Sequence, residues 1–268
     1  MLIAVGSVKG SPGATTVAVG LAASWPSGGA VLVEVDAEGG DLAARFGHCP
    51  QRGLTSLAAS ARAGARTQPL GWHTQRLGLG VDVVLAPPGN AAAAVHTVAC
   101  SARALLADAG TAVVCDVGRL TLGSPAAPIA AVADHLLLVT RPAREDLCHV
   151  DARIGWLRDE VAAGRLTVVL AGRGDYGPAD VALAWGVRVA GQLPHDRWGA
   201  GVLAGRLYSR GWRRLRLPRA IAGIPTALAH ISFAPTAATP AARQGAATVT
   251  PSVSPSPAGD RVGAVRTQ

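Results

Sequence analysis

Cysteine and lysine are scarce in this chain of 268 residues. The four cysteines (Cys49, Cys100, Cys115 and Cys148) lie far apart, which argues against both a zinc ribbon and a disulfide scaffold. No run of 18 apolar residues is present, so no membrane-spanning helix is expected. Charged residues make up only 16% of the chain and hydrophobic residues 49%, which provides enough apolar surface for a large core. We therefore expect a globular protein of the reducing cytoplasm.

Positive charge is unevenly distributed along the chain. Residues 1–196 carry 15 basic and 16 acidic side chains, whereas residues 197–268 carry ten arginines and a single acid, Asp260. Of the 25 basic residues 24 are arginine, and the remaining one, Lys9, lies in a glycine-containing loop near the start of the sequence. A nearly neutral body is thus followed by a strongly basic segment, whose arginines either bind an anionic partner or cover a solvated face.

Short apolar runs alternate with longer alanine-rich segments through residues 1–191. Most runs are nearly continuous in Val, Leu and Ile, as expected of parallel strands that are buried on both faces. The alternation predicts βαβ units and a doubly wound, mainly parallel α/β sheet. The predicted strands are Leu2–Gly6, Ala30–Asp36, Val81–Ala86, Thr111–Val117, His135–Thr140, Leu166–Ala171 and Val187–Gly191. The predicted helices are Gly13–Ser24, Asn90–Ala109, Arg144–Ala163 and Pro178–Trp185.

The composition changes near the C-terminal end of the sequence. From about Ala234 the chain is rich in Ala, Thr, Pro and Ser and has no hydrophobic periodicity. Such segments cannot bury enough apolar surface to fold. We predict an α/β domain over residues 1–232 and a disordered tail over residues 233–268.

The loop after the first predicted strand has the features of a phosphate-binding turn. It reads GSVKGSPGATT over residues 6–16, and a predicted helix follows it. Glycines let backbone N–H groups turn toward a phosphate, and the helix N-terminus adds unpaired donors. Thr15 is placed to offer a hydroxyl to Mg²⁺, and Thr16 to a phosphate oxygen. The ordinary P-loop pattern is met only in part, because Val8 replaces its first glycine and Ala14 its lysine. A glycine-rich turn without a ligand is the alternative interpretation.

The same loop resembles the deviant Walker A motif of the MinD/ParA family of ATPases, K-G-G-x-G-K-[ST]-[ST]. Ser11 stands where the family has a glycine, and Ala14 stands where it has its second lysine. The matching positions are Lys9 (the family's signature lysine), Gly10, Gly13, Thr15 and Thr16.

The resemblance continues along the chain, over roughly residues 1–230. VLVEVDAEGGDL is similar to the family's strand ending in D-x-D, with Glu34 at the first acid and Asp36 at the second. AVVCDVG resembles the Walker B strand and closes on Asp116, a position from which an acid can hold Mg²⁺ through water. HLLLVTRPAREDL, LTVVLAGR and VAGQLPHDR then follow in family order, the last near the base-side loop at Pro194 and Asp196.

The resemblance implies a P-loop NTPase fold with ATP and Mg²⁺ as cofactors. It assigns catalytic roles to Lys9 and Asp36, and Mg²⁺, partly through water, to Thr15, Asp36 and Asp116. The residues expected at the nucleotide are Lys9, Gly10, Ser11, Pro12, Gly13, Ala14, Thr15, Thr16, Arg173, Pro194 and Asp196. Many family members have Asn at the strand end where this chain has Gly172 and Arg173, so the identity of the base stays open.

The missing lysine changes the expected chemistry. In the family, one lysine holds the β- and γ-phosphates of its own subunit, and the signature lysine reaches across a nucleotide-sandwich dimer. Ala14 has neither a charge nor a donor, and a charge-assisted hydrogen bond contributes roughly 1.5–3 kcal/mol. Its loss predicts ATP binding weaker by roughly ten- to a hundredfold, and hydrolysis weakened at least as much. Arg45 and Arg119 are the nearby side chains that could compensate.

Residues 206–219 form the most basic stretch of the body, RLYSRGWRRLRLPR. Tyr208, Trp212 and Leu215 recur at helical spacing, which predicts a short helix with an apolar stripe that Pro218 ends. Three interpretations stay open for Arg206–Arg219: a non-specific DNA contact, an interfacial helix on an anionic membrane, and a last helix packed on the sheet with solvated arginines.

Together these features predict a MinD/ParA-like, ATP-dependent homodimerisation switch with weak or absent ATP hydrolysis. Its role would be intracellular positioning or partitioning of a chromosome, plasmid, septum, pilus or flagellum, under an unidentified protein regulator. The expected location is cytoplasmic, with association to the nucleoid or membrane. The alternative is a non-catalytic pseudo-ATPase scaffold, for example a TadZ/CpaE-like pilus-localisation protein.

Overall fold

The computed structural model describes residues 1–9, 12–26, 29–49, 51–64, 68–107, 109–161 and 164–231. The described residues include one eight-stranded sheet in the order β3-β4-β2-β5-β1-β6-β7-β8, in which only the β3–β4 pair is antiparallel. The strands are β1 (Leu2–Ser7), β2 (Ala30–Glu34), β3 (Gln75–Arg76), β4 (Asp82–Val84), β5 (Ala112–Arg119), β6 (His135–Thr140), β7 (Leu166–Ala171) and β8 (Arg188–Leu193). The predicted doubly wound, mainly parallel α/β fold is confirmed.

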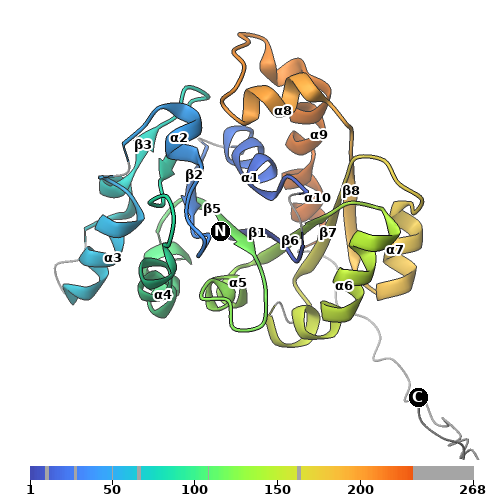
Figure 1. Cartoon of the computed structure of the whole chain (residues 1–268), viewed down its shortest axis with the longest axis horizontal. Coiled ribbons are helices and arrows are strands. Elements are labelled where there is room, and N and C mark those ends of the chain that lie inside the picture. Colours follow the sequence, from blue (N-terminus) through green and yellow to red (C-terminus); the bar gives the residue numbers. More distant parts are fainter. Residues whose placement is uncertain are drawn as a thin grey trace, which may run out of the picture. The chain divides into compact units, whose positions relative to one another are not determined.

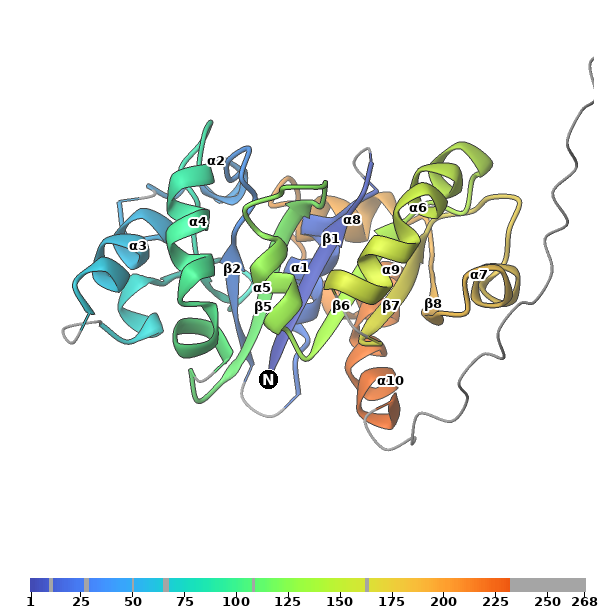
Figure 2. The same ribbon diagram turned by 90° about the horizontal axis from the view of Figure 1, so that it is seen from below.

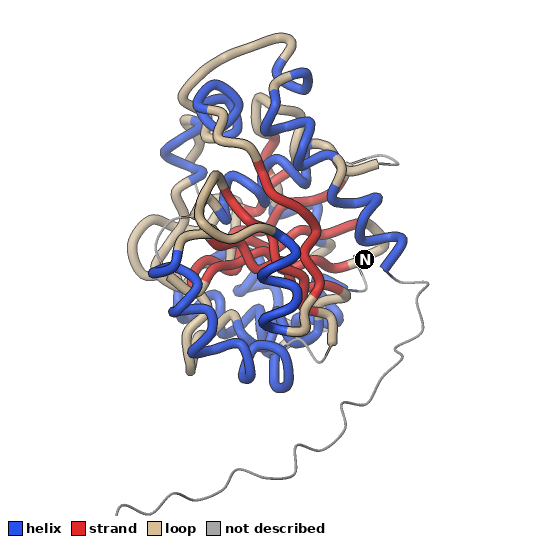
Figure 3. The backbone as a smooth tube through the Cα atoms, turned by 90° about the vertical axis from the view of Figure 1, so that its right-hand side faces the viewer, coloured by secondary structure: helices blue, strands red, loops and turns tan. Residues whose placement is uncertain are grey.

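Helices cover both faces of this sheet (Figure 1). One layer contains α1 (Ala14–Ala23), α2 (Leu42–Phe46), α8 (Arg197–Leu203), α9 (Arg216–Ala222) and α10 (Ile224–Ile231). The other contains α3 (Leu54–Arg62), α4 (Ala92–Cys100), α5 (Ala127–Val132), α6 (Arg144–Trp156) and α7 (Pro178–Trp185), which face the viewer in Figure 2. Figure 3 shows the strands as a central layer between helices.

The continuous apolar runs explain why the sheet is buried on both faces. All six residues of β1 are buried. Because side chains alternate across a strand, Leu2 and Ala4 join the core under the α3–α7 layer, while Ile3 and Val5 join the core under α1 and α8.

Two predicted helices are shorter than expected. The helix expected at residues 90–109 ends at Cys100, and a separate π-helical turn, η3 (Arg103–Ala107), follows it. The helix expected at 144–163 is α6 followed by a second π-helical turn, η4 (Leu157–Val161). The short helices α2, α3, α5, α8 and α10, which are five to nine residues long, were not predicted.

The prediction of one helix across the basic stretch is wrong. Residues 206–211 form turns and bends, and a 3₁₀ turn, η5 (Trp212–Arg214), precedes α9. Pro218 lies inside the first turn of α9 rather than ending a helix. A first-turn N–H has no intrahelical partner, so proline is tolerated there.

Two further expectations concern membranes and the tail. Within the described ranges, no helix is both long enough and apolar enough to cross a membrane. The predicted tail, residues 233–268, lies outside the described residues.

Candidate functional site

A cleft of about 1970 Å³ opens at the carboxyl edge of the sheet. Its walls include the ends of several parallel strands or the residues that follow them: Ser7, Asp36, Arg119, Arg141, Ala171 and Leu193. In open α/β sheets ligands bind at this edge, where the strand order reverses. The reversal lies here at β1, because the chain next builds strands on one side of it and later on the other.

The loop before α1 forms one wall of the cleft. Gly13 adopts φ 97°, the left-handed conformation that favours glycine, and it precedes the first turn of α1. No side chain caps that turn, so its N–H groups remain available to a ligand. Pro12, Gly13, Ala14, Thr15 and Thr16 line the cleft, as predicted for nucleotide-contacting residues. Gly10 and Ser11 lie outside the described residues.

Three predicted Mg²⁺ ligands converge beside this turn. Asp116 in β5 is 2% exposed, and its carboxylate accepts hydrogen bonds from the Thr15 side chain and from the Gly118 backbone N–H (3.2 Å). Asp36 follows the neighbouring strand β2, and its carboxyl group lies against Gly118. The resemblance to the MinD/ParA family assigned Thr15, Asp36 and Asp116 to one metal ion, and the structure brings these three residues together.

Burial makes the ionised form of both acids costly, and a bound cation would offset that cost. Burial raises the pKa of Asp116 to about 6, and burial also raises the pKa of Asp36 above its ordinary value. A divalent cation would relieve this cost, and carboxylate and hydroxyl oxygens are the donors that Mg²⁺ prefers. No group of three or more His, Cys, Asp or Glu side chains able to hold a metal occurs in the described part of the chain. Phosphate oxygens and water would therefore complete the shell of a metal bound here.

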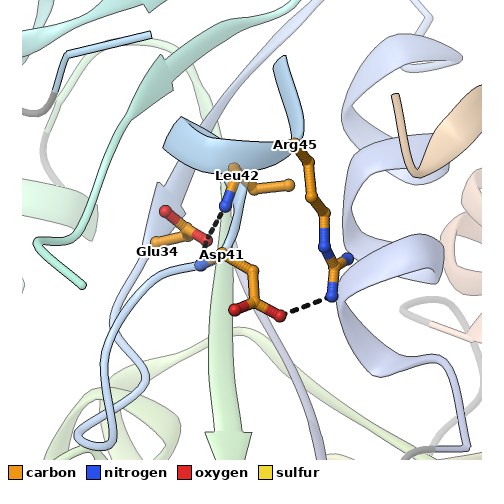
Figure 4. A network of polar contacts seen from close by, with 4 residues as sticks. All are labelled: Glu34, Asp41, Leu42 and Arg45. Atoms are coloured by element: carbon orange, nitrogen blue, oxygen red, sulfur yellow. Dashed lines mark hydrogen bonds and ion pairs between the residues drawn. The ribbon is translucent and has the colours of Figure 1, made fainter. Parts of the chain in front are cut away.

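Glu34 has a structural role beside this site. Its Oε1 accepts the backbone N–H groups of Asp41 and Leu42, both at 2.9 Å, and its Oε2 accepts that of Ala86 at 3.1 Å. Burial raises the pKa of Glu34 to about 7. The carboxyl group thereby holds the start of α2 against the end of β2, as seen in Figure 4. This contact fixes where α2 places its other side chains.

Lys9 does not point into its own cleft. Its Nζ lies 2.6 Å from Nε2 of His149, which belongs to α6. Lys9 is also absent from the residues that line the cleft, unlike Ala14, which is buried in its wall. The structure therefore separates Lys9 from Thr15 and Asp116 within one subunit.

The predicted base-side residues lie at the opposite wall of the cleft. Arg173 and Pro194 line it, together with Gln192, whose Nε2 donates to the Gly172 carbonyl at 2.8 Å. Asp196, the remaining predicted residue of this wall, also has a structural role, because it accepts the backbone N–H of Gly199 at 2.9 Å and that of Leu217 at 3.0 Å.

These two contacts join the starts of α8 and α9. Burial alone would raise the pKa of Asp196, but these hydrogen bonds outweigh it and lower that pKa below its ordinary value. Asp196 thus lines the cleft while its carboxylate holds two helix starts in place.

The cleft has more arginines than acidic residues in its described lining. The acidic residues are Asp36, Glu38, Asp41 and Asp196. The lining arginines are Arg45, Arg119, Arg141, Arg173, Arg197, Arg206 and Arg216. Of these, the sequence pointed to Arg45, Arg119, Arg173 and the stretch from Arg206. It did not point to Arg141, although its place just after β6, at the carboxyl edge, could have revealed it.

The basic stretch mixes structural and exposed side chains. Trp212 is 7% exposed and packs in the core shared with α1, while Arg213 lies over its ring at 4.5 Å and donates to the Ala23 carbonyl at 3.1 Å. Tyr208, by contrast, is 84% exposed, so the expected apolar stripe is not a single face. Arg210 and Arg214 are exposed outside the cleft.

Comparison with known proteins identifies the fold. No family model matches the chain, and no curated protein matches it in sequence. Among solved structures, a ParA family ATPase from Chlorobium tepidum TLS matches with a TM-score of 0.65 at 17% identity, covering 85% of this chain and 98% of that one. The septum site-determining protein MinD complexed with Mg-ADP, from Pyrococcus horikoshii OT3, matches with a TM-score of 0.64 at 15% identity, covering 87% and 97%.

A third similar structure is the MinC:MinD cell division protein complex of Aquifex aeolicus, with a TM-score of 0.61 at 16% identity over 89% of this chain and 98% of that one. The sheet and its two helical layers are thus arranged as in these proteins. The chain has the fold of the MinD and ParA ATPases.

Proposed function

We propose that this protein is a MinD/ParA-like nucleotide-dependent switch that binds ATP and Mg²⁺ in the cleft and serves intracellular positioning. The observation that carries the proposal is the convergence of Thr15, Asp116 and Asp36 beside the uncapped first turn of α1. Both acids are desolvated, and the turn offers N–H donors for phosphate. The similar MinD structure complexed with Mg-ADP supports the same cofactors here.

Catalysis is expected to be weak. Bound Mg²⁺ supplies charge neutralisation for a transferring phosphoryl group, and Thr15, Asp36 and Asp116 would hold it. Ala14 contributes no charge at the position where the family has its second lysine. ATP would then act mainly as a ligand that stabilises one state of the protein, with slow or absent hydrolysis.

The active state is proposed to be a homodimer formed across the nucleotide. Lys9 is exposed and does not line its own cleft, and its contact with His149 uses one of three N–H donors, so the other two can reach a partner subunit. Lys9→Ala should therefore abolish ATP-dependent dimerisation. Analytical ultracentrifugation with and without ATP·Mg²⁺ tests this, and equal sedimentation of both proteins under both conditions would contradict it.

Calorimetric titration of ATP·Mg²⁺ into the full chain tests binding itself. Wild type should bind, Asp116→Asn should lose the Mg²⁺-dependent part of the affinity, and Ala14→Lys should bind more tightly. Absence of heat in wild type together with binding by Ala14→Lys would favour the second candidate function, a pseudo-ATPase scaffold of the TadZ/CpaE-like kind. The observation that favours this alternative is Ala14 itself.

The exposed arginines of residues 206–219 are proposed to contact DNA or an anionic membrane, and the similar MinC:MinD complex supports a further protein regulator. Arg210 and Arg214 suit a test because both are exposed outside the cleft. Replacing both with alanine should reduce salt-sensitive DNA retention, or co-sedimentation with anionic liposomes, whichever wild type shows. Replacing Arg103 and Arg144, exposed on the opposite helical layer, is the matched control. Equal retention by the two variants would contradict the assignment.

A further inference from the structure

Ala14 leaves the start of α1 without a side-chain cation. It lines the cleft between Gly13 and Thr15, where a nucleotide phosphate would meet the first turn of the helix. Backbone N–H groups supply partial charges only, whereas a triphosphate with its metal still carries net negative charge. Within one subunit, a compensating cation would have to come from another element of the fold.

Arg45 lines the same cleft as the residues of this turn. It belongs to α2, which packs in the same layer as α1. Asp41, the ion-pair partner of its guanidinium, lines the same cleft. Arg119 also lines the cleft, but from the end of β5.

The backbone of Arg45 is held by two neighbours. Its N–H donates to the Asp41 carbonyl at 3.0 Å within α2, whose start is itself held by Glu34. Gly205, with φ 71°, approaches so closely that a Cβ there would lie 2.6 Å from the Arg45 carbonyl oxygen. The position from which the side chain extends is therefore set by β2 on one side and by the end of α8 on the other.

The Arg45 guanidinium is oriented and still has free donors. Nη2 donates to Asp41 Oδ2 at 2.5 Å, and the side chain is 25% exposed (Figure 4). A guanidinium has five N–H donors, and no other side-chain hydrogen bond of Arg45 occurs within the described residues. Its planar fork can contact two phosphate oxygens at once while it keeps the ion pair.

We propose that Arg45, oriented by Asp41, contacts the β- and γ-phosphates of the bound nucleotide and replaces the lysine that Ala14 lacks. This inference rests on the proposed function, since it names a residue of the same nucleotide site. In this arrangement α2 supplies the cation that the loop supplies in the family motif, and the loop still provides its backbone N–H donors and Thr15.

A double-mutant cycle tests the inference. Calorimetry with ATP·Mg²⁺ should show binding about 10- to 100-fold weaker in Arg45→Ala than in wild type, and Arg45→Lys should retain part of the affinity. Ala14→Lys should increase the affinity of Arg45→Ala by at least tenfold and that of wild type by much less, since the two cations would serve the same phosphates. AMP, which lacks these phosphates, should bind wild type and Arg45→Ala equally.

Arg119→Ala is the matched control, because Arg119 lines the same cleft but extends from the end of β5 rather than from α2. Thermal unfolding of every variant shows whether the fold is retained. If wild type binds ATP and Arg45→Ala binds it equally well, the inference is wrong while the proposed function stands. If wild type fails to bind and Ala14→Lys binds, Arg45 does not replace the lysine. If neither binds, the proposed function fails as well.

Discussion

Replacing Gly118 with alanine should displace Asp36 from the cleft. Gly118 has φ 60°, and a Cβ there would lie 2.1 Å from the Asp36 Cγ. An ordinary carbon contact is about 3.5–4.0 Å, so the carboxyl group has to move by well over ~1 Å. Asp36 is only partly buried, which lets its side chain rotate away rather than force the strand apart.

The magnitude follows from two costs. A left-handed backbone in alanine costs about 1–2 kcal/mol, and an off-rotamer aspartate costs about 0.5–1.5 kcal/mol more. Gly123→Ala is the matched control, because Gly123 lines the same cleft with φ 80° but has no atom within 4 Å of its added Cβ. We expect Gly118→Ala to lose roughly 1.5–3.5 kcal/mol of stability and Gly123→Ala roughly 1–2 kcal/mol.

Urea unfolding and ATP·Mg²⁺ calorimetry on both variants provide the assay. Gly118→Ala should lose most of the Mg²⁺-dependent part of the nucleotide affinity, whereas Gly123→Ala should retain it. Adding Asp36→Ala to Gly118→Ala should remove the stability difference between the two glycine variants. Equal stability and equal Mg²⁺ dependence in the two single variants would refute the argument that Gly118 exists to make room for Asp36.

Three further predictions concern stability. Burial raises the pKa of Glu34 from 4.5 to about 7, so between these pH values the native state holds a proton that the unfolded state releases. Without Mg²⁺, the free energy of unfolding should therefore fall by up to ~3 kcal/mol as the pH rises from 4.5 to about 7. Urea unfolding should show a smaller dependence on pH in Glu34→Gln than in wild type. Asp196→Ala removes the acceptor of two backbone N–H groups and should lower the free energy of unfolding by about 1–3 kcal/mol. Asp180→Ala, which removes one exposed contact to Gly177, should cost less. Equal losses would contradict the conclusion that Asp196 holds the starts of both α8 and α9. Trp212→Ala should lose about 3–5 kcal/mol and Tyr208→Ala almost nothing, and a small loss at Trp212 would show that its ring is not part of the core.

The sequence by itself determined the sheet and the position of the site. Runs such as VLVEV and AVVCDVG are apolar at nearly every position, and only strands buried on both faces require that pattern. Parallel strands bring their carboxyl ends to one edge, and the likeness of three segments to MinD/ParA motifs assigned Thr15, Asp36 and Asp116 to that edge. Local sequence features were therefore enough to predict the residues that directly follow a strand.

Tertiary structure decided what depends on contacts between distant segments. Helix α2 is too short to show a period, and Glu34 from β2 supplies the acceptors for its first N–H groups, which in turn fixes Arg45. Lys9 and His149 are 140 positions apart, and no pattern in either segment pairs them. Burial of Trp212 likewise follows from its packing with the α1 layer, which the spacing of aromatic residues in the basic stretch does not encode. The positions of the strands along the chain follow from local composition, whereas the order of the strands and the side chains that surround the cleft are decided by packing across the fold.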